Sequence, residues 1–207
     1  ETWLRQQGKR DKFNLTFFNA AAEPGKRLGE KAVKNLLVEM QRRGVTTHLG
    51  EKILGFDERS VKTENATLPA DLILFMPGLT GPAWAAQSGV ELSPGGFFPA
   101  DEYCAVKGCD KVFVAGDAGS YPGPDWLPKQ AHMADLQAQA AAENLALALA
   151  GKPPFAKPRP ELICIVDSVD TGMLVYRDTK RSMMLPSSKV FHWAKRYFET
   201  HYLRAFR

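Results

Sequence analysis

The sequence predicts an α/β fold in which helices pack against parallel strands that are buried on both faces. Two near-continuous apolar runs, residues 71–78 and 111–117, lack the alternation that is typical of a strand with one exposed face. Residues 131–150 are rich in alanine, the best helix former, and are expected to form a helix that packs closely on a sheet or a ligand. A strand, a helix and a strand between residues 13 and 48 favour half of a nucleotide-binding unit.

The composition is that of an ordinary globular protein. The 207 residues, 44% of them hydrophobic, suffice for one large domain or two small ones, and a net charge of +4 does not indicate a nucleic-acid partner. No apolar run approaches the roughly 20 residues that span a bilayer. The chain does not begin with Met and shows no signal pattern, so it is expected to be a processed product or a fragment.

Cysteine and histidine usage predicts neither disulfides nor a metal site. Three cysteines cannot form a closed disulfide framework. The four histidines are scattered and lack the spacing of zinc ligands. Cys104 and Cys109, five residues apart, match no redox motif and are expected to be structural or incidental.

Three domains are predicted, residues 1–76, 77–155 and 156–207. In the first, the expected elements are a helix end stopped at Gly8, a strand at 13–17, a helix at 30–44, a short strand at 45–48 and a hairpin at 53–63. The second holds the run that ends at Asp117 and the alanine-rich helix. The proline-rich stretch 152–160 is expected to be a stiff extended linker to the third domain, which holds strands at 162–166 and 173–176 and a terminal helix.

The apolar run K-V-F-V-A-G-D ends on Gly116 and Asp117. In open α/β sheets, ligands bind outside the carboxyl ends of the strands. A glycine there lets a ligand approach the backbone, and a carboxylate accepts hydrogen bonds from sugar-alcohol hydroxyls. The helix that starts near Lys129 presents unpaired N–H groups. The alternative is a helix N-cap or a turn aspartate, and Gly-Asp alone leaves both interpretations open.

With its flanks, V-F-V-A-G-D…P-G-P-D-W-L-P-K-Q-A…A-A-A-E-N-L resembles the second FAD-binding motif of flavoproteins with two dinucleotide-binding domains. The resemblance implies a partial Rossmann-like fold with a small α+β C-terminal region. It implies that Gly116 and Asp117 hold the flavin ribityl chain. It also implies that Lys129, Gln130 and Ala131 lie near the pyrimidine edge, where a cation or a helix dipole stabilises an anionic reduced flavin.

Further features resemble the sulfide:quinone oxidoreductase and flavocytochrome c sulfide dehydrogenase group. Pro-Lys precedes the helix, a cysteine lies in E-L-I-C-I-V-D-S-V-D-T-G, and the terminal segment holds H-W-A-K-R-Y-F-E. In the wider two-domain flavoproteins, Pro77-Gly78 resembles the crossover between the second nucleotide domain and the FAD domain. The resemblance departs in one respect, since no G-x-G-x-x-G occurs. The chain is therefore expected to be the C-terminal half of a flavoprotein, to lack the pyrophosphate cradle, and to hold FAD poorly in isolation.

Cys164 occupies the place of a C-terminal redox cysteine in the sulfide-oxidising relatives. A redox role requires a depressed thiol pKa and a partner cysteine. The alternative is an inert cysteine on an apolar strand, flanked by Ile163 and Ile165.

The terminal segment 189–207 is expected to be an amphipathic helix. Six apolar residues share one face in projection: Phe191, Ala194, Phe198, Tyr202, Ala205 and Phe206. Arg196, Arg204 and Arg207 lie roughly opposite, and Lys195 interrupts the apolar side. Such a helix can lie in a membrane interface, where the resembled oxidoreductases frame a quinone channel, or it can dock on its own domain.

The resemblance implies an FAD-dependent oxidoreductase that passes electrons from a sulfur or nicotinamide donor through flavin to a quinone, a haem partner or another acceptor. Two alternatives stay open: an NADH-dependent flavin oxidoreductase with an inert Cys164, and a cofactor-free scaffold or membrane-docking module. A bacterial protein in the cytoplasm or at the membrane periphery is expected. The isolated chain is expected to be inactive, and homo-oligomerisation is left open.

Overall fold

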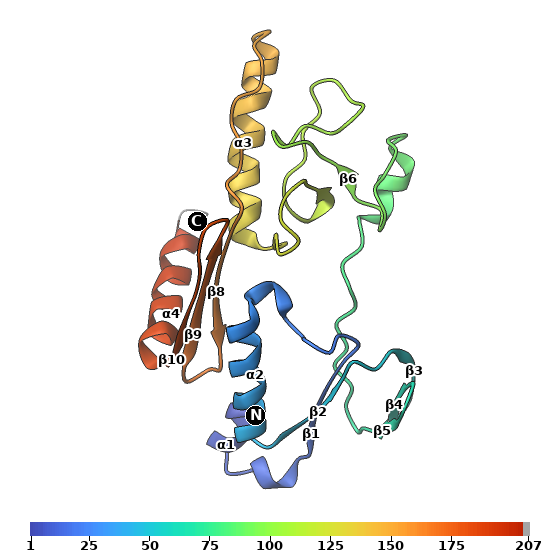
Figure 1. Cartoon of the computed structure of the whole chain (residues 1–207), viewed down its shortest axis with the longest axis vertical. Coiled ribbons are helices and arrows are strands. Elements are labelled where there is room, and N and C mark those ends of the chain that lie inside the picture. The colour runs from blue at the N-terminus through green and yellow to red at the C-terminus, as the bar shows by residue number, and fades with distance from the viewer. Residues whose placement is uncertain (205–207) are drawn as a thin grey trace. The chain divides into compact units, whose positions relative to one another are not determined.

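The computed structural model describes residues 1–204 and divides into two compact units (Figure 1). Unit 1 comprises Glu1–Met76, Cys164–Tyr176 and the residues from Ser182, and unit 2 comprises Pro77–Ile163 and Arg177–Arg181. The three-domain division stays a prediction. The expected helix residues Ala205, Phe206 and Arg207 lie outside the described residues.

Residues 1–204 form helices, short 3-10 turns and strands. The helices are α1 (Thr2–Gln6), α2 (Glu30–Arg42), α3 (Ala131–Leu149) and α4 (Lys189–Arg204), with short 3-10 turns η1 (Arg10–Lys12), η2 (Lys26–Leu28), η3 (Ala83–Gln87) and η4 (Gly116–Ala118). The strands are β1 (Leu15–Asn19), β2 (Val45–Leu49), β3 (Ile53–Asp57), β4 (Ser60–Thr63), β5 (Thr67–Pro69), β6 (Phe98–Pro99), β7 (Gly119–Ser120), β8 (Glu161–Asp167), β9 (Gly172–Asp178) and β10 (Ser182–Ser188).

Unit 1 contains the predicted strand–helix–strand. β1 and β2 pair in parallel, from Leu15 opposite Val45 to Asn19 opposite Leu49, and α2 connects them. Ala32 and Val33 on α2 are buried. Gly44 follows the last turn of α2 with φ 66°, a left-handed conformation that favours glycine and ends the helix. The predicted hairpin is confirmed as β3 and β4, and β5 adds a third antiparallel strand.

The C-terminal elements form an antiparallel sheet in the order β10-β9-β8, whose strands are joined by short turns. α4 is tied to β8 by Asp167, which accepts a hydrogen bond from Nδ1 of His192 at 3.0 Å and pairs with Nζ of Lys195 at 3.5 Å. Parallel pairs, helices and this antiparallel sheet confirm the predicted α/β class with a partial Rossmann-like fold and a small α+β C-terminal region.

The two apolar runs do not form the predicted buried strands. Residues 71–78 are irregular, and the side chains of Leu72, Leu74 and Met76 are 74%, 80% and 91% exposed. A parallel strand needs hydrogen-bonded neighbours, and no other strand of residues 1–204 pairs with this run. In the second run, backbone hydrogen bonds join Val112 and Val114 to the nearby residues Val106 and Cys104 instead.

α3 is the central helix of unit 2. Its buried residues are Met133, Gln137, Ala140, Ala141 and Asn144. Two apolar clusters make the core of this unit. One is Ala85, Phe98, Ala100, Val106 and Val114, and the other is Cys104, Ala140 and Ala141. The short strands β6 and β7 pair in parallel beside the first cluster.

The proline-rich stretch 152–160 is fastened to α3, although the sequence indicated only a stiff linker. Asn144 is fully buried, and its Nδ2 donates to the carbonyl oxygens of Tyr103 at 2.9 Å and Ala156 at 2.8 Å. Its Oδ1 accepts from the backbone N–H groups of Phe155 and Ala156, both at 2.9 Å. Figure 1 shows this stretch running along the helix.

Replacement of Asn144 by Leu is expected to destabilise unit 2 by about 2–4 kcal/mol, because buried backbone groups lose their hydrogen-bond partners while the side-chain volume is kept. Thermal and denaturant unfolding followed by circular dichroism measure the loss. The matched control is Gln139→Leu, which introduces the same leucine side chain at an exposed amide position of the same helix. Equal stability of the two variants contradicts this role of Asn144.

Candidate functional site

The Gly116-Asp117 turn follows the second apolar run. Ala115 is extended, with φ −133° and ψ 151°, and Gly116 then takes φ 72°, so the chain turns sharply into η4. The side chain of Asp117 is exposed, and within residues 1–204 its carboxylate has neither a hydrogen bond nor an ion pair. It does not cap η4, whose N-cap is Ala115, or α3, whose N-cap is Gln130. Asp117 is therefore not a helix N-cap, and it lies within the short turn η4.

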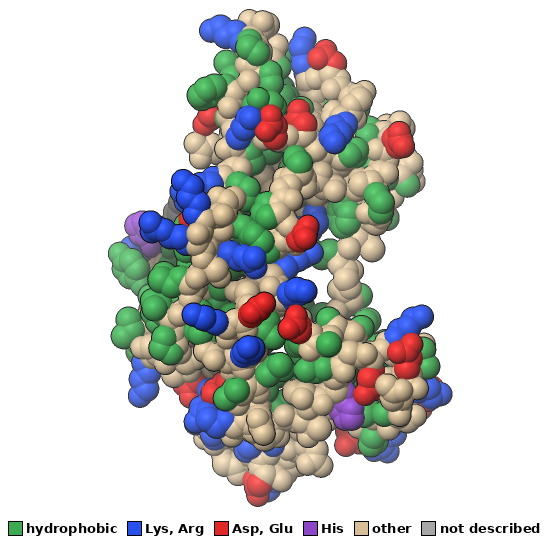
Figure 2. Space-filling model, viewed as in Figure 1, with side chains coloured by type: hydrophobic (Ala, Val, Ile, Leu, Met, Phe, Trp, Pro, Cys, Tyr) green, Lys and Arg blue, Asp and Glu red, His purple; other side chains and the backbone are tan. Residues whose placement is uncertain are grey.

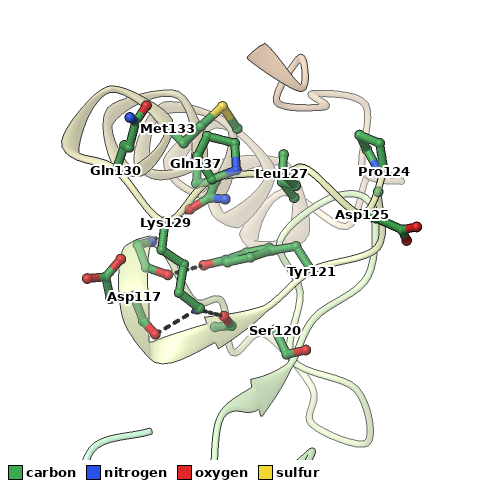
Figure 3. A pocket seen from close by; sticks show the side chains of 14 residues that line it. Asp117, Ser120, Tyr121, Pro124, Asp125, Leu127, Lys129, Gln130, Met133 and Gln137 are labelled. Carbon is green, nitrogen blue, oxygen red and sulfur yellow. Dashed lines mark hydrogen bonds between the residues drawn. The ribbon is translucent and has the colours of Figure 1, made fainter. Parts of the chain in front are cut away.

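Side chains of unit 2 hold this turn through its backbone (Figure 3). The N–H of Gly116 donates to Oε1 of Gln137 at 2.9 Å, and the hydroxyl of Tyr121 donates to the carbonyl of Gly116 at 3.2 Å. Nζ of Lys129 donates to the carbonyls of Asp117 at 2.9 Å and Gly119 at 2.5 Å. The conformation that presents Asp117 is thus fixed from three sides.

A cavity of about 270 Å³ lies between the turn and the start of α3. Its polar lining includes Asp117, Ser120, Asp125, Lys129 and Gln130, and Figure 3 shows these side chains around it. Oε1 of Gln130 is buried and has no hydrogen-bond partner among the described residues. Gln130 makes no side-chain cap, so within residues 1–204 no side chain caps the first N–H groups of α3, and the helix dipole makes this end positive. The cavity therefore offers a carboxylate and a positive helix terminus side by side.

The predicted site residues are not all brought together. Gly116, Asp117, Lys129 and Gln130 line the cavity, and Ala131 is the first residue of α3 directly beside it. Pro77 and Gly78 are not among the lining residues and lie in the irregular segment after residue 70. Their role in a domain crossover stays a prediction.

Lys129 has a second contact besides the turn. Its ammonium lies 4.2 Å from the centre of the Phe97 ring, an attractive cation–π geometry. The lysine that the sequence motif places near a flavin edge therefore also serves to fix the Asp117 turn. Its role at the pyrimidine edge stays a prediction.

The first turn of α3 is anchored to β8 through Glu161. Nε2 of His132 lies 2.5 Å from Oε1 of Glu161, and Arg159 contacts the same carboxylate. Burial raises the pKa of Glu161, but the hydrogen bonds from His132 and Arg159 outweigh it and hold that pKa below its usual range. The charged carboxylate thus keeps the N-terminal end of α3 in place.

Cys164 lies on β8 and is half-buried. Burial raises the pKa of its thiol, and the charge of Lys195 lowers that pKa only in part. Cys104 is fully buried, and burial raises its pKa to about 11. All three cysteines are free thiols. Within residues 1–204, no group of three or more His, Cys, Asp or Glu side chains could hold a metal ion.

Sequence reasoning missed Gln137 and Tyr121. Gln137 lies in an alanine-rich helix, where a polar residue reads as part of a solvated face, although it is only 4% exposed. The available signal was its position, since Gln137 and Asn144 are seven residues apart and therefore share one helix face.

The fold is a partial Rossmann-like α/β fold, and comparison with protein families gives the family. Residues 3–138 match the pyridine nucleotide-disulphide oxidoreductase model. The chain belongs to the pyridine nucleotide-disulphide oxidoreductase family. None of the curated proteins compared with the sequence matches it.

Solved structures share the fold. The sulfide:quinone oxidoreductase of the hyperthermophilic bacterium Aquifex aeolicus is similar with a TM-score of 0.87 and 22% identity, over 98% of this chain and 52% of that one. The water-forming NADH oxidase of Lactobacillus brevis has a TM-score of 0.55 and 16% identity, over 80% of this chain and 37% of that one. An FAD-dependent pyridine nucleotide-disulphide oxidoreductase of Desulfovibrio vulgaris has a TM-score of 0.50 and 19% identity, over 84% and 52%.

The chain thus spans about half the length of the Aquifex and Desulfovibrio proteins and a smaller share of the Lactobacillus protein. Identities this low show the fold and leave the chemistry to be argued from the residues. The family membership predicted from the sequence, with a structure similar to sulfide:quinone oxidoreductase, is confirmed.

The raised pKa of the Cys164 thiol predicts slow alkylation at neutral pH, because the neutral thiol is a poor nucleophile. The rate of iodoacetamide modification, followed by mass spectrometry with Cys164→Ser to assign the adduct, should keep rising past pH 9.0, the reference value of a free thiol. A plateau already reached at neutral pH would instead indicate a thiolate poised for redox chemistry.

Proposed function

We propose that these residues form part of an FAD-dependent oxidoreductase of the sulfide:quinone oxidoreductase type, which passes electrons from a sulfur or nicotinamide donor to a quinone or another acceptor. The observation that carries the proposal is the unpaired, exposed carboxylate of Asp117 on a turn held by Gln137, Tyr121 and Lys129. Nothing within residues 1–204 uses this carboxylate, so its fixed presentation suits a ligand.

The residues present fit one part of a flavin. Asp117 would accept hydrogen bonds from ribityl hydroxyls, and the close backbone at Gly116 leaves room for a polyol chain. The first turn of α3, after Gln130, would direct N–H groups at an electron-rich ring edge. A bound flavin supplies two-electron redox chemistry. A cavity of about 270 Å³ lies below the roughly 300–1,000 Å³ of a complete small-molecule site, which supports partial FAD binding by this chain.

A second candidate has its own support. The raised pKa of Cys164 disfavours the thiolate that a sulfur mechanism requires. It favours an NADH-dependent flavin oxidoreductase in which Cys164 is inert. Cys164→Ser separates the two, because loss of sulfide oxidation supports the sulfur mechanism and unchanged activity removes it. Absence of flavin from both the wild-type protein and the Cys164→Ser variant would favour the third alternative, a cofactor-free scaffold.

Asp117→Ala is expected to weaken FAD binding by roughly tenfold to a hundredfold, because hydrogen bonds to a charged group contribute about 1.5–3 kcal/mol. The dissociation constant is measured by reconstitution of flavin-free protein expressed from its complete reading frame. Asp110→Ala removes a carboxylate that is 90% exposed and lies outside the cavity, and should leave binding unchanged. Equal FAD affinity of the two variants would sink the role of Asp117.

We also propose that α4 contacts a membrane surface or lies on the side of the protein from which a quinone would enter. Within residues 1–204 no helix is long and apolar enough to cross a bilayer. Lys195 and His192 face β8, which explains why a lysine interrupts the predicted apolar side. Trp193, Tyr197 and Phe198 are 63%, 74% and 66% exposed, and Figure 2 shows hydrophobic and basic side chains at the surface over α4. These exposed aromatic side chains, together with the basic residues of α4, support an interfacial helix.

Flotation with vesicles that contain anionic lipid tests this role of α4. The chain should float with the vesicles, and Trp193→Glu with Phe198→Glu should keep it in the soluble fraction, because two charges prevent burial of the aromatic face. Val38→Glu, which changes a 62% exposed residue of α2, is the control for added charge. Equal flotation of all three proteins contradicts membrane contact through α4.

A further inference from the structure

We propose that Gln137 is a positioning residue for the Asp117 turn. This proposal rests on the proposed flavin-binding function. It adds to the flavin site a residue that lies outside the sequence motif on which the family resemblance is based. Its amide oxygen fixes the peptide that precedes Asp117, and the affinity for the ligand depends on this fixation. Gln137 does not need to touch the ligand for this role.

The position of Gln137 is unusual for a glutamine. Its side chain is 4% exposed on the buried face of α3, and Oε1 accepts from the N–H of Gly116 at 2.9 Å. The other amide group, Nε2, has no hydrogen-bond acceptor within residues 1–204, and the residue lines the cavity. A buried amide is costly unless its hydrogen bonds are made, so the bond to Gly116 must offset the burial of this side chain.

Gly116 depends on that bond because the chain passes very close to α3 there. A Cβ at Gly116 would lie 3.3 Å from Cβ of Ala134, and φ of 72° favours glycine. A residue with this freedom in the unfolded chain needs an external contact to hold one conformation. Gln137 holds its N–H, and the hydroxyl of Tyr121 holds its carbonyl at 3.2 Å.

The hydroxyl of Tyr121 is a permanent donor over the working pH range, since burial raises the pKa of Tyr121 well above its ordinary value. The Tyr121 ring also lies against Gly119, where a Cβ would come within 2.3 Å of the hydroxyl oxygen. The positive φ of Gly116 and the close approach of Tyr121 to Gly119 thus favour glycine at both ends of the turn. Figure 3 shows these two side chains on the inner side of the turn and the carboxylate of Asp117 directed away from them.

The consequence is preorganisation. Because the backbone is fixed before and after it, Asp117 needs little ordering when a polyol binds. A preorganised site therefore loses less binding free energy to the ordering of its own residues. Loss of Oε1 leaves a buried N–H without an acceptor, so the turn relaxes and the carboxylate samples more orientations. Stability and ligand affinity then fall together, but only affinity reports the positioning role.

The test compares three variants in protein expressed from its complete reading frame. Gln137→Met removes the acceptor at similar volume, Gln137→Glu keeps an acceptor oxygen, and Gln139→Met makes the same change at an exposed position of the same helix. Two quantities are measured: the FAD dissociation constant after reconstitution, and the hydrogen-exchange rate of the Gly116 amide in the flavin-free protein.

Gln137→Met is expected to weaken FAD binding on the order of tenfold and to accelerate exchange at Gly116, because a net hydrogen bond and preorganisation are lost. Gln137→Glu should restore both quantities, and Gln139→Met should resemble the wild type. If Gln137→Met does not fold, Tyr121→Phe, which removes only the donor to the Gly116 carbonyl, should weaken binding several-fold.

Each other result overturns the inference. If Gln137→Met binds FAD as tightly as the wild type, the positioning role of Gln137 is removed while flavin binding stands. Where Tyr121→Phe replaces that variant, unchanged FAD affinity leads to the same conclusion. Equal weakening in the Met and Glu variants assigns the effect to Nε2 and contradicts action through Gly116. A wild-type protein that binds no FAD removes the proposed function and this inference together.

Discussion

Unit 2 depends on hydrogen bonds from two buried side-chain amides on one face of α3. Gln137 holds the turn before Asp117, and Asn144 holds the extended stretch 152–160. The alanines around them let the backbone of neighbouring segments approach the helix, as at Gly116 and Ala134. The amides then satisfy backbone groups that regular strands do not pair. The candidate site is therefore built on a rigid helix and presented by a short turn.

The same helix supplies the electrostatics of the site. Its N-terminal end borders the cavity, and Glu161 with His132 anchors that end to β8. Lys129, directly before α3, donates to the carbonyl oxygens of the turn and leaves the carboxylate of Asp117 available. One helix thus combines a structural role along its buried face with the proposed binding role at its positive end.

Local patterns predicted the elements well. Helical spacing and Gly44 indicated α2, alanine content indicated α3, and the Gly-Asp motif with its flanks indicated the family. The apolar runs at 71–78 and 111–117 misled, because a strand exists only where a neighbour pairs with it and periodicity carries no information about neighbours. Gln137 escaped prediction because burial of a polar residue depends on which segment packs over it. For α4, the residue pattern left two alternatives, and the structure shows a helix docked through Asp167 that still exposes aromatic side chains.

We propose that the carboxylate of Asp117 is held in place for the polyol chain of a flavin. A crystal structure of the protein expressed from its complete reading frame, with FAD bound, tests it most directly. We expect ribityl hydroxyls within hydrogen-bonding distance of Asp117, the ring edge at the first turn of α3, and an intact hydrogen bond between Gly116 and Gln137. Flavin density elsewhere, with Asp117 still unpaired, would contradict it.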